Sequence, residues 1–567
     1  MGPPPRTPKT SPPDSARNRV DWGFPGPHSP SPLPSPANPR PSLLRSAGVV
    51  GMMTLLSRLT GLAQTFFLSH VLGAGAAADA YAVAFRLPNL LRRFTAEGTM
   101  TAAFLPTLAE AEAAEGEQAM KAVAARFMGT LLTILLAGVA LMLLCMRPLA
   151  ALLTLGRPPA QAELTALLGR LMFPYLAMVS LTAGFAGVLN LRHRFALAAS
   201  VSIFWNLAFI GFGWTALRVL GHSGRPPIGT VAVVCALAVL AGGVVQLLML
   251  VPAARREGFG IAYGWHASDP WVAKALRRMG PGLLAAGIYP INALISTALA
   301  SKLDDGAQMV LLNSGMMGEM VLGLFAMSLA TAGLPTLSRQ AQAGDWDGMN
   351  RSFTQAMSAC LLLVLPASLG LALLARPICA LLFRTGAYSA FASDWTARTV
   401  MFQCAGLAFV ATQRLGNQAL YAVKDYRGPA ALAAVTLALN VALSLALLRP
   451  LGTGGLALAN GLASLAGVAG LLWRLRPRLP GLGLAPILGP AGKALLACVF
   501  MGLMAWGGAR VLGIYAPHGL SRFALSLRLL PLVALSAATY GVAVVGLGHP
   551  EAQGLVAKIK VKLFGAA

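Results

Sequence analysis

This sequence is poor in charge. Only 11% of its 567 residues are Asp, Glu, Lys or Arg, whereas 56% are hydrophobic. A water-soluble chain carries about 25% charged residues, so there are too few here to cover the surface of a soluble protein of this length. The composition therefore excludes an ordinary soluble protein and predicts one that lies in a membrane.

The sequence also lacks the residue spacings of enzymes and metal sites. Its six cysteines are isolated, and none has the spacing of a disulfide framework or a metal site. There is no intramembrane His cluster and no nucleotide-binding motif of the Walker type. The adjacent carboxylates Asp304 and Asp305 indicate a solvated loop. We therefore expect neither an enzyme nor a cofactor, and a coupling ion or the membrane potential stays open as the energy source.

The net charge of +25 does not indicate nucleic-acid binding, because the basic residues are scattered over short loops. With the N-terminus in the cytoplasm, the loops predicted inside are richer in Arg and Lys than those outside, as the positive-inside rule requires. Examples are Arg192, Arg255, Arg277 and Lys424. An even number of spans returns the C-terminus, with its basic tail at 550–567, to the cytoplasm.

Apolar windows long enough to cross a bilayer, which takes about 20 residues as a helix, recur along the chain. Clear windows occupy 127–146, 171–191, 195–217, 226–254, 279–301, 352–375, 429–448, 450–473 and 529–549. Weaker or charge-bearing windows occupy 43–68, 77–105, 307–338, 392–421 and 488–509. Because lipid cannot satisfy backbone polar groups, these windows predict an all-α polytopic membrane protein with about 14 transmembrane helices.

Residues 1–42 differ from the rest of the chain. They are dense in Pro, Ser and Arg and have no apolar period. This composition predicts a disordered cytoplasmic tail without the apolar core of a cleavable signal peptide. A docking tail for a partner and a dispensable extension both stay open.

A weak duplication runs through the chain. The segment "FLPTLAEAEAAEG" resembles "GLPTLSRQAQAGD", and "MRPLAALL" resembles "ARPICALL". Pro106 and Pro335 of the first pair are 229 residues apart, as are Pro148 and Pro377 of the second. This period covers six helices, an even number of crossings, so both halves have the same orientation in the membrane.

The repeat predicts two pseudo-symmetric six-helix lobes, at about 43–254 and 271–475, followed by two extra helices at 486–549. Transporters built from such repeats bind their substrate between the halves. Rocking of one half against the other then gives alternating access.

The second predicted span contains the stretch "LPNLLRRFTAEG", in which two arginines and a glutamate interrupt an apolar run. At about 100° per residue, one face of a continuous helix would carry four charged residues. These are Asp79, Arg86, Arg93 and Glu97. Pro88 disturbs that register. Arg92 and Arg93 as interfacial anchors, and Asp79 as the cap of its own helix, are alternatives.

Two further charges lie inside predicted spans. Arg58 is in the middle of the first, and Glu319 is in the eighth, where it alternatively pairs with a neighbouring arginine. A charge in the middle of a span is costly, so such residues usually face a wet cavity and carry function. Guanidinium groups match phosphate oxygens, so a cavity with several arginines suits an anionic lipid such as a lipid diphosphate.

These residues also carry a resemblance to a known family. The run "SRLTGLAQTFFLSHVLGAGAAADAYAVAFRLPNLLRRFTAEGTMTAAFLPTLAE", residues 57–110, resembles the start of the MurJ/MviN family. The resemblance continues more thinly through "VLNLRHRF", "LPTLSRQ" and "LYAVKDYRGP" and covers nearly the whole chain from residue 43. That family comprises the lipid II flippases of bacterial peptidoglycan synthesis, in the MOP exporter superfamily. It implies a V-shaped two-lobe bundle with a central cationic cavity and a prenyl groove beside the last two helices.

Residue-by-residue matching implies substrate-binding or transport roles for Arg58, Asp79, Arg92, Glu97 and Glu319. Because Pro88 makes the helical wheel unreliable, we follow the resemblance, which favours Arg92, over the wheel, which favours Arg93. Arg93 stays a secondary candidate.

Two positions depart from the family pattern. Gln64 and Met316 stand where the resemblance leads us to expect arginines. Lys302 and Arg414 are the candidate substitutes for these missing cations. The departure puts the identity of the substrate in doubt more than the fold.

We predict a multi-pass protein of the bacterial inner membrane with both termini in the cytoplasm. It would flip lipid II from the inner to the outer leaflet by alternating access. Its expected partners are the lipid substrate, membrane lipids and cell-wall synthesis proteins, but not nucleic acid. A flippase for another polyprenyl-diphosphate sugar, of the exopolysaccharide or O-antigen type, an ion-coupled exporter and a non-transporting scaffold stay open.

Overall fold

The structure is a computed structural model that describes residues 2, 41–96, 99–224, 226–286, 288–425, 427–479, 481–516 and 519–564. The chain divides into two compact units, Met1–Gly48 and Val49–Ala567, and the second unit contains every candidate site residue. In the described part, regular structure is helical apart from one isolated bridge between Thr385 and Tyr388. The predicted tail at 1–42 lies almost wholly outside the described residues.

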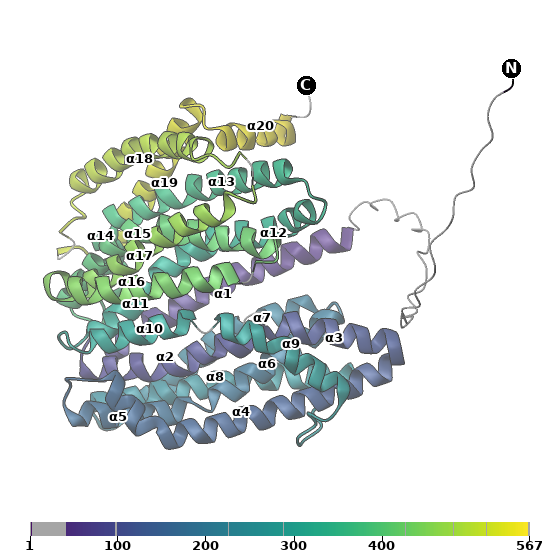
Figure 1. Ribbon diagram of the computed structural model, residues 1–567. Coiled ribbons are helices and arrows are strands. Elements are labelled where there is room, and N and C mark those ends of the chain that lie inside the picture. Colours follow the sequence, from purple (N-terminus) through teal and green to yellow (C-terminus); the bar gives the residue numbers. More distant parts are fainter. Residues whose placement is uncertain are drawn as a thin grey trace. The chain divides into compact units, whose positions relative to one another are not determined.

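The first half of the chain forms helices α1 to α8; α2 to α8 lie together in the lower part of Figure 1, and α1 runs above them. Their bounds are α1 Pro41–Leu72, α2 Ala76–Ala96, α3 Thr99–Glu115, α4 Glu117–Leu153, α5 Pro159–Met172, α6 Tyr175–Leu191, α7 Phe195–Leu220 and α8 Ile228–Arg256. The second half begins with two helices, α9 Pro270–Ala286 and α10 Ile288–Ala300.

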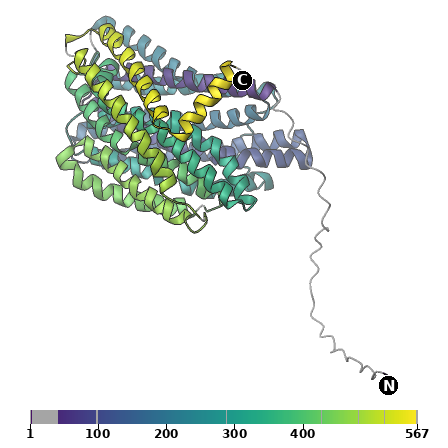
Figure 2. The ribbon, with the colours of Figure 1, turned by 90° about the horizontal axis from the view of Figure 1, so that it is seen from above.

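The second half continues with α11 Ala307–Val321, a π-helical segment η2 Leu322–Ala326, α12 Met327–Gln342, α13 Trp346–Leu373, α14 Ala375–Phe383, α15 Ala390–Ala422, α16 Arg427–Leu451 and α17 Thr453–Leu475. The last helices are α18 Ala485–Val511, α19 Arg522–Gly546 and α20 Pro550–Phe564. The helix α18 packs against α13, and α19 packs against α18 and α14. Both ribbon views place these yellow helices beside the green ones (Figures 1 and 2).

Local sequence signals start several of these helices. Asp345 Oδ1 accepts a hydrogen bond from Gly348 N at 2.8 Å and caps α13. Ser389 and Ser521 cap α15 and α19 in the same way. Short side-chain acceptors at this position satisfy backbone N–H groups that the first helical turn leaves free.

The predicted transmembrane helices are present. In the described part, ten helical stretches are long and apolar enough to cross a membrane. The other four predicted spans, 43–68, 77–105, 279–301 and 392–421, are also helical, in α1, α2–α3, α9–α10 and α15. Charged residues or breaks in the helix distinguish these four spans from the other ten. For example, α2 ends at Ala96 and α3 begins at Thr99, so the window 77–105 is not one continuous helix. The chain is an all-α, multi-pass membrane protein.

The bounds of the helices confirm the duplication. The helix α4 begins at Glu117 and α13 at Trp346, which are 229 positions apart, the same separation as Pro106 and Pro335. The helices α5 to α8 recur in order as α15 to α17, with α5 and α6 fused into α15. In the same way α2 and α3 correspond to α11, η2 and α12. The lobe boundaries 43–254 and 271–475 stay predictions, because residues 49–567 form a single compact unit.

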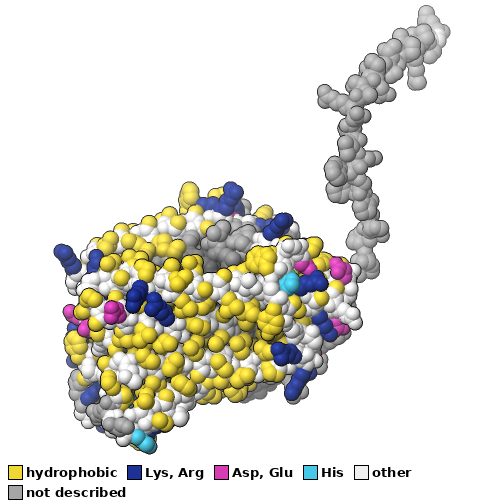
Figure 3. Space-filling model, turned by 90° about the horizontal axis from the view of Figure 1, so that it is seen from below, with side chains coloured by type: hydrophobic (Ala, Val, Ile, Leu, Met, Phe, Trp, Pro, Cys, Tyr) yellow, Lys and Arg dark blue, Asp and Glu magenta, His cyan; other side chains and the backbone are white. Residues whose placement is uncertain are grey.

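The outer surface suits lipid. Large apolar side chains are exposed on several spanning helices, such as Leu144 on α4, Val511 on α18 and Val542 on α19. The face in Figure 3 is covered mainly by hydrophobic side chains, with most Lys and Arg toward its margins. This distribution agrees with a band of protein surface in contact with the hydrocarbon core of a bilayer.

Candidate functional site

A cavity of about 1000 Å³ lies between the two halves. Residues of α1, α2, α6, α7 and α8 form one side, and residues of α10, α11, α15, α16 and α17 form the other. Its lining reaches Asn190, Tyr421 and Pro429, close to the ends of α6 and α15 and the start of α16. The cavity therefore extends to the end of the molecule at which these helices meet their short loops.

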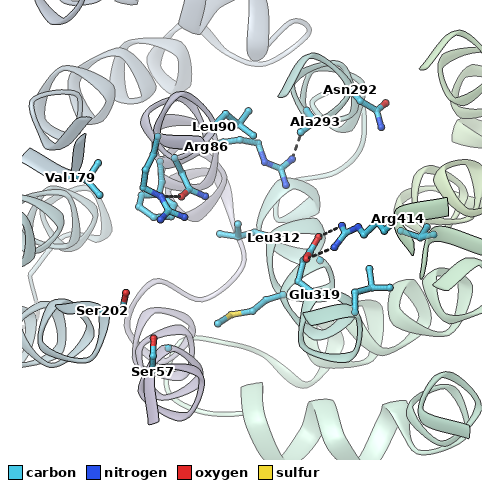
Figure 4. A pocket seen from close by; sticks show the side chains of 18 of the residues that line it. Ser57, Arg86, Leu90, Val179, Ser202, Asn292, Ala293, Leu312, Glu319 and Arg414 are labelled. Carbon is cyan, nitrogen blue, oxygen red and sulfur yellow. Dashed lines mark hydrogen bonds and ion pairs between the residues drawn. The ribbon is translucent and has the colours of Figure 1, made fainter. Parts of the chain in front are cut away.

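The helix α2 presents cations to this cavity. Arg86, Asn89 and Arg92, spaced three residues apart, all line it, so they share one face of the helix. Arg92 Nε donates to Asn89 Oδ1 at 3.2 Å. Arg86 Nη1 donates to Thr297 Oγ1 at 2.5 Å and, more weakly, to the backbone oxygen of Ala293 at 3.4 Å, the contact drawn in Figure 4.

On the opposite side, an ion pair joins α11 to α15. Arg414 Nη2 and Nη1 donate to the two carboxylate oxygens of Glu319 at 2.7 and 3.1 Å, a bidentate pair visible in Figure 4. Both side chains are partly exposed to the cavity, Arg414 by 24% and Glu319 by 40%. This pair confirms the alternative interpretation of Glu319 as the partner of an arginine.

The remaining polar lining consists of amides and hydroxyls. The amide side chains are Gln64, Asn89, Asn190, Asn206, Gln246, Asn292, Gln403, Gln413, Asn417 and Asn460. The charged residues in the described lining are Arg86, Arg92, Arg414 and Glu319. The cavity is therefore weakly cationic and rich in groups that both donate and accept hydrogen bonds.

Arg58 lies beside the cavity, against the π-helical segment. A Cβ atom on Gly323 of η2 would collide with the guanidinium nitrogens of Arg58, so the glycine leaves the space that this guanidinium occupies. A π-helical turn inside an α-helix is uncommon and occurs frequently at functional sites. Arg58 thus connects the middle of α1 with the irregular part of the second half.

The two halves are joined at the end where α2 begins. Asp79 is fully buried, and its carboxylate accepts hydrogen bonds from Gly306 N at 2.8 Å and Met309 N at 2.9 Å. It therefore caps α11 of the other half, and the alternative interpretation, that it caps its own helix, is wrong. Arg157 pairs with Asp305 and lies 3.6 Å from Asp79, so a small charge network closes this end.

Contacts of α1 with the loop before α15 add to this closure. Ala387 N donates to the backbone oxygen of His70 at 2.8 Å, and His70 Nδ1 lies 2.7 Å from Thr385 Oγ1. Gly73 has a φ of +67° and lies under Ala387, where a side chain would collide. Backbone contacts as close as these require the halves to be pressed together at this end.

Only some of the candidate residues line the cavity. Five of them do: Gln64, Arg92, Met316, Glu319 and Arg414. Arg58 lies next to its lining, whereas Asp79 and the exposed Lys302 do not line it. Glu97 and the side chain of Arg93 lie outside the described residues.

Arg86 and the amide side chains other than that of Gln64 line the cavity although they were not among the candidate site residues. Arg86 is on the predicted charged face of α2, and the helical wheel is the signal that points to it. Asparagine and glutamine inside a span are less costly than charges and give no comparable signal. Among the described residues, no group of three or more His, Cys, Asp or Glu is placed to hold a metal ion.

Comparison with known proteins agrees with this architecture. A family model described as lipid II flippase MurJ matches residues 68–522. A probable lipid II flippase MurJ of Rhizobium meliloti is 32% identical over 443 residues, which cover 76% of this chain and 81% of the relative. A probable lipid II flippase MurJ of Haemophilus influenzae is 30% identical over 521 residues, which cover 88% of this chain and 98% of the relative.

Solved structures show the same fold. A lipid II flippase MurJ in an inward closed conformation aligns with a TM-score of 0.70 at 20% identity, covering 87% of this chain and 98% of that one. A multidrug resistance MATE family transporter of the MOP superfamily, in an inward-facing conformation, aligns with a TM-score of 0.63 at 14% identity. That alignment covers 77% of this chain and 98% of the transporter.

Proposed function

This chain belongs to the MurJ family of lipid II flippases, and we propose that it moves lipid II from the inner to the outer leaflet of the bacterial inner membrane. Members of this family are membrane transporters and not enzymes. In this proposal both termini lie in the cytoplasm, as the distribution of basic loops favours. The substrate is a polyprenyl-diphosphate lipid taken from the surrounding membrane.

The observation that carries the proposal is the pair of arginines on α2. Arg86 and Arg92 line a cavity between two repeated halves, and the amides around them match a polar head group. A guanidinium group binds two phosphate oxygens at once, which a diphosphate offers. A cationic drug would be repelled by this lining, so an exporter of such drugs is disfavoured.

The difference between the two ends of the cavity supports alternating access as the mechanism. In the proposed orientation, the end closed by Asp79, Arg157 and the His70–Thr385 contact faces outward. The cavity reaches the helix ends on the cytoplasmic side and admits the head group there. Opening the outer end then requires the hydrogen bonds between the Asp79 carboxylate and the backbone of α11 to break. The two halves would rotate relative to each other as rigid bodies, with the cavity between them. The energy source is either a coupled ion or the membrane potential.

A second candidate is a flippase for another polyprenyl-diphosphate sugar. Gln64 and Met316 line the cavity where the family resemblance leads us to expect arginines. Arg414 is the candidate substitute in the lining, but its guanidinium is engaged by Glu319. The diphosphate is then held mainly by α2, and the rest of the cavity decides which head group fits.

Depletion rescue tests the proposal. The chain is expressed in a bacterium whose own lipid II flippase can be switched off, and growth and lipid II exposure at the outer leaflet are measured. We expect rescue by the wild-type chain but not by the Arg92→Ala variant at equal abundance. No rescue, together with export of a different polyprenyl-linked sugar, would establish the second candidate instead.

A further inference from the structure

One face of α15 lines the cavity from Gln403 to Tyr421, near the end of the helix. Gln403, Leu407, Val410, Arg414 and Asn417 follow one another at spacings of three or four residues, and all line the cavity. This spacing places them on a single helical stripe. The polar positions of the stripe are therefore fixed by the helix and presented together to a ligand.

This stripe is not built to hold a diphosphate. Arg414, its cation, is engaged on both sides of its guanidinium fork by the carboxylate of Glu319. A diphosphate approaching the stripe would meet the negative charge of Glu319 at short range. The anion is better placed on the other side of the cavity, where Arg86 and Arg92 lie.

Two amides of the stripe have unmet hydrogen-bonding capacity. The oxygens Gln403 Oε1 and Asn417 Oδ1 are buried and have no hydrogen-bond partner in the described part of the chain. An unpaired buried carbonyl oxygen is costly, so a ligand that donates to it gains affinity. Both side chains line the cavity, and a half-turn about the last side-chain torsion, which has a broad minimum, would bring each oxygen to the cavity side.

The chemistry of the missing partner follows from the atom that needs it. A carbonyl oxygen accepts hydrogen bonds, whereas an ionised diphosphate has only acceptor oxygens and cannot donate. Sugar hydroxyls and peptide N–H groups donate. A lipid-linked saccharide has both kinds of group at opposite ends of its polar part: acceptors at the diphosphate and donors at the head.

We propose that Gln403 and Asn417 of α15 bind the hydrogen-bond donors of the head group, the sugar hydroxyls or the peptide N–H groups, while α2 holds the diphosphate. This inference rests on the proposed function and assigns specificity to the second half of the molecule. The α2 side recognises any polyprenyl diphosphate. The α15 side distinguishes between head groups.

The test is a binding series with three lipids: a bare polyprenyl diphosphate, the same lipid carrying the disaccharide without peptide, and lipid II. The proteins are the purified full chain, Gln403→Leu, Asn417→Leu and the matched control Gln418→Leu. Gln418 is the neighbour of Asn417 on α15 and does not line the cavity. Asn417→Ser, which keeps a small polar side chain, serves as a second variant should the leucine variant fold poorly.

We expect each leucine variant at Gln403 or Asn417 to bind lipid II about five to ten times more weakly, the loss expected for one hydrogen bond. Binding of the bare diphosphate should not change, and Gln418→Leu should resemble the wild type with all three lipids. An equal loss with the disaccharide lipid assigns the contact to sugar hydroxyls, and a loss with lipid II alone assigns it to the peptide.

Two results would overturn the inference and leave the proposed function intact. One is unchanged lipid II binding by both amide variants; the other is an equal loss for lipid II and the bare diphosphate, which would show a structural role. If the wild-type chain binds none of the three lipids, the proposed function itself fails.

Discussion

The helix α2 and the segment α11–η2 occupy equivalent places in the two halves, since Ala76 and Ala307 begin them 231 positions apart. Each contains a feature that departs from a standard α-helix: Pro88 within α2 has no backbone N–H to donate, and Leu322–Ala326 forms a π-helical turn. Their charges differ: α2 presents two arginines, whereas α11 presents Glu319. The two halves therefore place equivalent helices beside the cavity, and these helices carry different charges.

The largest effect should come from removing the cation that distinguishes α2. Arg92→Ala should lower lipid II flipping by roughly 100-fold, because a charge-assisted bidentate contact is lost. Arg92→Lys should recover only part of the activity, since an ammonium group lacks the planar fork. Flipping is measured in proteoliposomes at matched protein abundance. Arg93→Ala is the control and should leave flipping nearly unchanged. Normal flipping by Arg92→Ala would contradict the proposed role of α2 in binding the diphosphate.

The next effect concerns the irregular turn of the second half. Gly323→Ala should reduce flipping by about tenfold, because the new methyl group displaces the Arg58 guanidinium. Gly333→Ala in α12, where a Cβ meets nothing within 4 Å, is the matched control.

A double-mutant cycle tests whether Gly323 acts through Arg58. If it does, Arg58→Ala with Gly323→Ala should be no worse than Arg58→Ala alone. Additive losses would mean that the glycine matters for another reason, such as the packing of the π-helical turn itself.

Adding a positive charge at the positions where arginines are missing should have a smaller effect, and it should strengthen binding instead of weakening function. Met316→Arg and Gln64→Arg should each tighten binding of lipid II and of a bare polyprenyl diphosphate by up to about tenfold and by similar factors. Affinity is measured by titration at fixed salt, because the contact is ionic. If neither substitution changes affinity, the hypothesis that cations in this cavity recognise the diphosphate is wrong.

The smallest effect should come from a substitution at the end of the cavity that is closed by Asp79. Asp79→Asn keeps the shape of the side chain but replaces one acceptor oxygen with a donor, so one of the two caps of α11 is lost. We expect about 1–2 kcal/mol less protection of the amides at 306–310, measured by hydrogen exchange. Asp305→Asn, whose carboxylate is 55% exposed, should change protection little. Equal effects of the two substitutions would contradict the capping role.

The features that could best be predicted from the sequence are patterns within a single helix and similarities between the two repeated halves. Hydrophobic windows predicted the transmembrane helices, and the equal separations of Pro106–Pro335 and Pro148–Pro377 predicted the duplication without knowledge of any helix bound. Arg92 stands out because charge in an apolar run is costly and therefore conspicuous. The resemblance to a family then decided between Arg92 and Arg93.

Features that depend on contacts between distant segments were not predictable. Asp79 binds backbone groups 227 and 230 positions away, and nothing local distinguishes such a residue from the cap of its own helix. The amides Gln403 and Asn417 became candidates only when the fold placed them on one wall of a cavity. The π-helical turn at 322–326 likewise has no Pro that would mark it in the sequence.

The Glu319–Arg414 pair has an electrical consequence. Because it cancels one arginine, the described lining retains two net positive charges, those of Arg86 and Arg92. A diphosphate diester carries two negative charges, so the cavity is nearly neutral around a bound diphosphate and cationic when empty. An electric field across the membrane does work of about 2.3 kcal/mol per charge per 100 mV. If the protein works by alternating access as proposed, an inside-negative potential acts mainly on the empty cavity, draws its arginines inward, and favours the return of the empty cavity over the movement of the loaded one.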